Sequence, residues 1–183
     1  MSACGSQGGS EGNGQASPVP TGAAEAVSTV SPDVPLTVYQ SPSLGYSISY
    51  PEDWEAQPGG NGGDNFIRMT PDGRVAALLT VACYKAQEGW TPEVLMTQDA
   101  KAVATVGQFH GATPTDVEVA GVAGKERRYW LSVAATGFII EHVVAYLISG
   151  DCGWRIGLAS YGENTLDPYI PLFDRILASF RLS

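Results

Sequence analysis

Few side chains in this 183-residue chain could perform acid-base chemistry, and its two histidines, His110 and His142, are the first to consider. Neighbouring side chains of a strand point to opposite faces, so His142 cannot pair with the adjacent Glu141. If the hairpin that contains His142 closes symmetrically around Thr136, His142 faces Tyr129, and such a pair could transfer protons. A histidine that simply packs against a tyrosine within a sheet is the commoner arrangement, and both interpretations stay open.

Other catalytic and metal-binding patterns are incomplete. A nucleophile elbow requires Gly-x-Ser-x-Gly, and residues 158–162 lack the first glycine. Asp151, and separately the neighbouring pair Glu52 and Asp53, supply too few carboxylates for a calcium loop. His110 is expected at the surface, near the C-terminal end of a helix. We therefore predict no catalytic residue, no metal, no cofactor and no enzyme activity.

The first four residues, Met1-Ser2-Ala3-Cys4, place small side chains directly before a cysteine. They are similar to the end of the bacterial lipoprotein signal, although the Leu three positions before Cys4 is missing and no apolar region precedes it. The resemblance implies that Cys4 carries a diacylglycerol, usually with a further acyl chain such as palmitate. It also implies anchoring at the outer face of the cell membrane or in the periplasm. The alternative, a stray cysteine on a cytosolic protein, stays open.

Residues 5–35 have the composition of a flexible tether, because Gly, Ser, Pro, Ala and Thr predominate and aromatic residues, Lys and Arg are absent. We predict a lipid-anchored, disordered tether over residues 1–35 and one folded domain over residues 36–183. No apolar run approaches the roughly 20 residues of a transmembrane helix. The net charge of −9 disfavours nucleic acid and anionic lipid headgroups as partners.

With Cys4 assigned to lipid, Cys83 and Cys152 remain as one pair. In an oxidising compartment such a pair predicts a disulfide. Two buried free thiols are the alternative. A zinc site is disfavoured, because neither histidine lies at finger-like spacing from either cysteine.

Hydrophobic periodicity predicts an α+β domain with an antiparallel sheet. Thr91, Pro92 and Glu93 form a helix start, and this helix is expected to run to about residue 108. Asp167 and Pro168 begin a terminal helix with one apolar stripe. The strands are expected at residues 46–50, 66–69, 75–84, 117–119, 125–133, 138–148 and 154–160.

Three segments resemble the Mog1/PsbP-like superfamily. They are Tyr46-Ser-Ile-Ser-Tyr-Pro-Glu-Asp-Trp54, the glycine-containing link Val119-Ala-Gly-Val-Ala-Gly124, and the closing Ile176-Leu-Ala-Ser-Phe180. The resemblance covers residues 36–183. It implies an α-β-α sandwich around a central antiparallel sheet of about six strands. It also implies a non-enzymatic binding or assembly role, although fold alone does not determine function.

The sequence thus favours a protein-binding or assembly module that is tethered to the membrane and engages an envelope protein or complex. Tyr39, Trp54 and Trp90 lie near expected turns or strand ends and are candidates for exposed partner contacts. Burial at the rim of the core is the alternative for these three aromatic residues. The alternative function is a carrier or receptor for a small apolar ligand or lipid, with a pocket between the sheet and a helix.

Overall fold

The computed structural model describes residues 31, 33–59, 63–133 and 136–183. Among them, eight strands form one large antiparallel sheet, in the order β3-β4-β5-β10-β9-β8-β6, with β7 also paired to β8. The bounds are β3 (Glu55–Gln57), β4 (Gly63–Met69), β5 (Val75–Lys85), β6 (Gln108–Gly111), β7 (Thr115–Val119), β8 (Val122–Val133), β9 (Phe138–Ser149) and β10 (Cys152–Tyr161).

A second, smaller antiparallel sheet has the order β1-β2-β11, with β1 (Leu36–Gln40), β2 (Tyr46–Pro51) and β11 (Arg181–Leu182). It joins the two ends of the folded part, because the last strand pairs with β2 rather than with a neighbour in sequence. The helices are α1 (Pro92–Val103) and α2 (Ile170–Ser179), the latter preceded by the short 3₁₀ helix η1 (Asp167–Tyr169).

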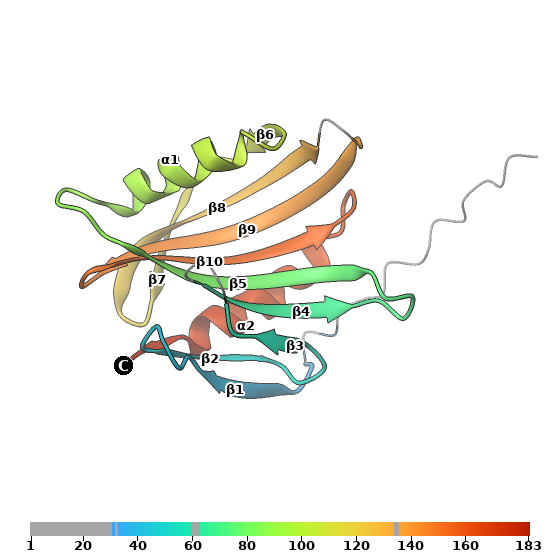
Figure 1. Ribbon diagram of the computed structural model, residues 1–183, viewed down its shortest axis with the longest axis horizontal. Helices are drawn as coiled ribbons and strands as arrows, with labels where there is room; N and C mark the ends of the chain where they lie inside the picture. Colours follow the sequence, from blue (N-terminus) through green and yellow to red (C-terminus); the bar gives the residue numbers. More distant parts are fainter. Residues whose placement is uncertain (1–30, 32, 60–62, 134–135) are drawn as a thin grey trace, which may run out of the picture.

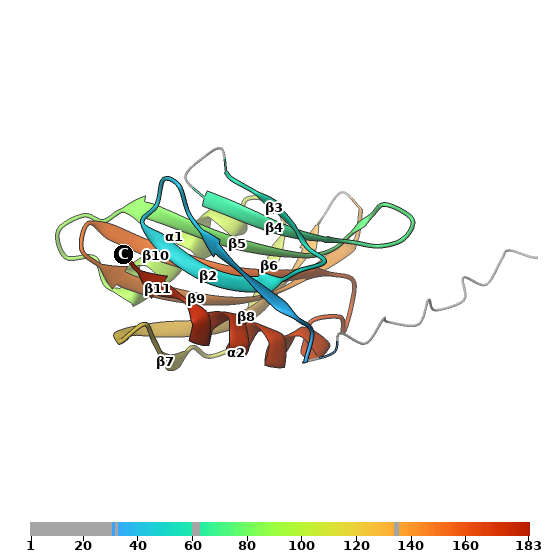
Figure 2. The same ribbon diagram turned by 90° about the horizontal axis from the view of Figure 1, so that it is seen from below.

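The two helices lie on opposite faces of the large sheet (Figures 1 and 2). This confirms the sandwich around an antiparallel sheet that the sequence resemblance implied, although the large sheet of the described residues has eight strands rather than about six. Neither helix in the described ranges has the length and hydropathy that crossing a bilayer requires.

The start of α1 is where the sequence placed it: the Thr91 hydroxyl accepts a hydrogen bond from the Val94 amide at 3.3 Å. Its end was predicted wrongly. The helix stops at Val103, and Gln108–Gly111 form β6, which pairs with β8. From this strand, Phe109 packs against the cluster that contains Leu95 and Met96 of α1.

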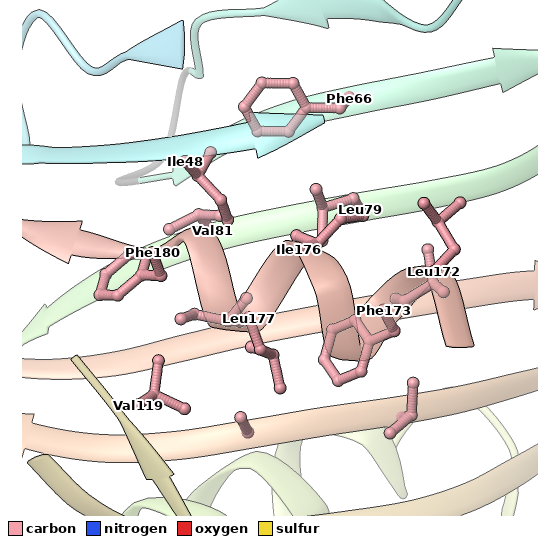
Figure 3. Packing of buried hydrophobic residues seen from close by; sticks show 14 of the residues in the cluster. Ile48, Phe66, Leu79, Val81, Val119, Leu172, Phe173, Ile176, Leu177 and Phe180 are labelled. Atoms are coloured by element: carbon pink, nitrogen blue, oxygen red, sulfur yellow. The ribbon is translucent and has the colours of Figure 1, made fainter. Parts of the chain in front are cut away.

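The main core lies between the large sheet, α2 and the small sheet. On α2, Leu172, Phe173 and Ile176 have no exposed surface, and Ile48 from β2 is equally buried. In Figure 3, Ile48 lies beside Val81 of β5, and Ile176 lies beside Leu79 of the same strand. The stripe predicted on the terminal helix is therefore core.

Candidate functional site

The His142 and Tyr129 side chains face each other, as the hairpin geometry predicted. They are register partners on β9 and β8, and their rings stack with centroids 4.6 Å apart. Burial, followed by the nearby Arg155 charge, lowers the pKa of His142 to about 4. Its Nε2 is buried and has no hydrogen-bond partner among the described residues. At neutral pH this imidazole is therefore uncharged.

A charged cluster links this pair to α1. Arg155 Nε donates to Asp99 Oδ1 at 2.9 Å, and the Tyr146 hydroxyl donates to Asp99 Oδ2 at 2.5 Å. Arg155 Nη2 also donates to the Tyr129 hydroxyl at 3.2 Å. The Arg155 and Asp99 side chains are only 13% and 12% exposed. Because Asp99 belongs to α1, this cluster fixes the helix on the sheet, and His142 with Tyr129 lies within that contact.

A pocket of about 300 Å³ lies at one edge of the sheet, where β6, β8, β9 and the loop after β10 meet. His110 and Trp130 stack there with ring centroids 3.7 Å apart and an interplanar angle of 11°. Trp130 is 39% exposed. Arg128 Nη1 lies 3.7 Å from Asp167 Oδ1, and both side chains are substantially exposed. The pocket thus presents an aromatic surface beside charges of both signs.

Glu141 shapes the wall of this pocket. Its carboxylate accepts hydrogen bonds from the backbone amides of Asn164, Thr165 and Leu166 at 3.0, 2.8 and 2.8 Å. Three amide donors compensate the carboxylate charge and hold the loop against the sheet. Glu141 is consequently a structural group rather than a free base.

A second candidate surface lies on the face that carries α1. There, Ile67 of β4, Leu78 of β5, Phe138 and Ile140 of β9, and Tyr161 of β10 form what we call the open strip. The register places them on one face, because Ile67 pairs with Leu78 and Leu78 pairs with the small Ala159. Two residues beyond Ala159, Tyr161 pairs with Ile140. Phe138, two residues before Ile140, is 46% exposed. No helix is drawn across the front of β4 and β5 (Figure 1). All five residues of the open strip are exposed or half-buried.

The aromatic residues proposed as partner contacts do not form one surface. Trp54 is only 5% exposed and lies in the main core near Tyr169, so its interpretation as an exposed contact is wrong. Tyr39 and Trp90 are half-buried and pack against the two cores, Trp90 beside Gly153, which has no side chain to occupy that space. The exposed Trp130 and Phe138 were missed, although strict alternation along β8 could have marked Trp130 as outward-facing.

Cys83 and Cys152 form a disulfide between the neighbouring strands β5 and β10, with Cα atoms 5.5 Å apart. The predicted pairing is therefore confirmed. Cys4, the predicted lipid attachment site, lies outside the described residues.

The alternative function, a carrier, requires a pocket between the sheet and a helix. The edge pocket lies elsewhere, at the side of the sheet where β6 ends. Phe173 and Ile176 fill the space under α2, and Asp99 with its partners fills the space under α1.

No family model matches the sequence, and no curated protein matches it. Solved structures are similar to it in fold. The cyanobacterial PsbP protein CyanoP from Synechocystis sp. PCC 6803 aligns over 81% of this chain and 92% of its own, with a TM-score of 0.60 and 16% identity. A point mutant of protein Mog1 aligns over 81% and 96%, with a TM-score of 0.61 and 7% identity.

A protein of unknown function from Pseudomonas aeruginosa, PA94, aligns over 79% of this chain and 94% of its own, with a TM-score of 0.54 and 13% identity. At these identities the likeness concerns the fold alone. The folded part of the chain has the Mog1/PsbP-like fold.

Proposed function

We propose that this protein is a non-enzymatic binding module, tethered by lipid at the outer face of a bacterial membrane, which binds another envelope protein or its assembly intermediate. The observation that carries the proposal is the open strip. Contiguous apolar surface that no element covers is typical of interaction sites, and five strip residues come from four neighbouring strands of a rigid sheet.

The chemistry of the open strip favours binding over catalysis. Its aliphatic and phenyl side chains do not titrate near neutral pH, and its one tyrosine, Tyr161, has a pKa raised further by burial. The nearest histidine, His142, is uncharged at neutral pH and packed within the contact with α1. A broad apolar surface of this kind suits the side chains of a protein partner.

The proposal includes the tether predicted from the composition of residues 1–35. A flexible coil of about 30 residues has a root-mean-square span of roughly 30 Å, so a domain on such a tether would stand off the bilayer while remaining close to it. Confinement near the membrane raises the effective concentration of a partner in the same membrane. In this proposal the lipid on Cys4 supplies the confinement, and the folded domain supplies the specificity.

The test is site-specific photo-crosslinking of the full-length lipoprotein in its native membranes. A photo-reactive residue replaces Phe138 of the open strip, and the matched control replaces Val38, which is 69% exposed on β1 of the small sheet. We expect one envelope protein to be captured from position 138 and not from position 38. The yield should fall in a Cys4→Ala variant, because the tether is then free of the membrane.

Equal capture from both positions, or none from position 138, would overturn the open strip as the contact. A co-purifying lipid or metabolite, with no captured protein, would replace the binding module by the carrier.

A further inference from the structure

The edge of the large sheet at β6 offers free backbone groups. β6 and β7 both pair with β8, one after the other, and β6 ends the strand order of the described residues. The Ala112 amide donates to the Arg128 carbonyl at 2.8 Å. Because hydrogen-bonded pairs alternate along an antiparallel ladder, Phe109 and Gly111 direct their N–H and C=O groups away from β8.

This edge lacks charged residues and proline, two of the protections that strand edges usually carry. Charged side chains and proline commonly block the pairing of an edge with another chain. β7 carries Asp116 and Glu118, and Pro114 separates it from β6. β6 itself, Gln-Phe-His-Gly, has neither a charged residue nor a proline, and its ends are exposed. Its short length is the one protective feature.

The edge pocket lies directly beside this free edge, because His110, Gly111 and Ala112 line both. Side chains of a strand added to β6 would alternate between the two faces of the sheet. Those on the His110 side would meet the His110 ring, which stacks on the Trp130 indole, at the mouth of the edge pocket. The Asp167 carboxylate lines the same pocket, and its side chain is 90% exposed although Arg128 lies 3.7 Å away. An aromatic ring beside a carboxylate suits a cationic side chain.

We propose that the β6 edge binds an extended, basic segment of another polypeptide, which adds a strand through Phe109 and Gly111 and places a Lys or Arg side chain in the edge pocket, against the stacked rings of His110 and Trp130 and near Asp167. Main-chain pairing provides the affinity and the pocket provides the selectivity, as in other strand-addition complexes. The acidic net charge of −9 favours a basic partner over a second copy of this chain. This goes beyond the proposed function, because it concerns a different surface from the open strip.

The test is residue-resolved amide hydrogen exchange of the full chain with a synthetic probe, the heptapeptide Lys-Val-Lys-Val-Lys-Val-Lys. Its control is the acidic counterpart, with Glu in place of Lys. We expect the basic peptide to slow exchange of the Phe109 and Gly111 amides about tenfold or more at saturation, because both amides gain an acceptor. The acidic peptide should leave both amides unchanged.

Pocket variants test the side-chain part. Trp130→Ala should weaken binding of the basic peptide about fivefold, and Asp167→Asn about twofold. Glu88→Gln, an exposed acid in the loop before α1, is the matched control and should leave binding unchanged. No protection of either amide at millimolar peptide would overturn the proposal. So would protection confined to the open strip, or protection without peptide in a chain that sediments as a dimer.

Discussion

The two faces of the large sheet are closed by different means. On one face, α2 and the small sheet bury an almost entirely apolar core in which Leu79, Phe173 and Ile176 are fully inaccessible. On the other, α1 covers part of the sheet and is held by the charged cluster of Asp99 and Arg155. The first face is thus closed by apolar packing. The second leaves the open strip free, and it requires polar contacts to position a short helix.

The largest loss of stability is expected from a substitution in the apolar core under α2. Phe173→Ala removes a fully buried ring at the centre of the α2 contact, and the cavity left behind should lower the free energy of unfolding by about 4 kcal/mol. Chemical denaturation of the two proteins measures it. A loss below about 1 kcal/mol would mean that this face is less tightly packed than the structure indicates.

The disulfide belongs to the same face, because both cysteines adjoin its core. Replacing both Cys83 and Cys152 by Ala removes a covalent link between residues 69 apart in sequence. The free energy of unfolding should fall by about 3 kcal/mol, mainly because the unfolded chain gains conformational entropy. Reduction of the wild-type protein under the same denaturant series is the control and should give a similar loss. A variant as stable as the oxidised protein would contradict the prediction.

On the face that carries α1, stability should depend on the balance of charge between Asp99 and Arg155 rather than on side-chain volume. Asp99→Ala leaves the Arg155 guanidinium buried without its counter-charge, and should lower stability by about 3 kcal/mol. The double variant Asp99→Leu with Arg155→Met removes both charges and should recover much of that loss. If the double variant is less stable than Asp99→Ala, the cluster stabilises α1 by more than charge compensation.

The smallest predicted effect is a change in stability with pH, which comes from His142 on the face that carries α1. Because burial lowers the pKa of His142 to about 4, the unfolded chain takes up a proton near pH 6.5 that the folded chain does not bind. Stability should therefore fall by about 2 kcal/mol between pH 7 and pH 5 from this group. Denaturation of a His142→Gln variant over the same pH range should show a flatter profile, and an unchanged slope would contradict the assignment.

Long, periodic segments were predictable from the sequence. Alternation and apolar runs placed β2, β5, β8, β9 and β10 close to their observed bounds, since each of these strands buries several apolar side chains. The short strands β1, β3, β6 and β11 were not predicted. They contain two to five residues each, too few for a period to be recognised, and pairing with a distant neighbour decides their conformation.

The candidate surfaces were less predictable than the fold, for the same reason. The contact of Tyr129 with His142 followed from hairpin symmetry, a local property. The edge pocket depends on Glu141 binding the amides of residues 164–166, and the charged cluster depends on Arg155 of β10 reaching Asp99 of α1. Both arrangements bring together residues far apart in sequence, which no local pattern encodes.

The pairing of β11 with β2 has a consequence for the timing of folding. β2 is made early, yet its partner on one side consists of Arg181 and Leu182. The Ser183 amide extends this contact by donating to the Gly45 carbonyl. During synthesis, one edge of β2 therefore stays unpaired until Arg181 and Leu182 have left the ribosome. Because this contact spans nearly the whole domain, it closes a very large loop and should be among the last to form. A chain without residues 181–183 would keep α1 and α2 but lose the pairing between β2 and β11.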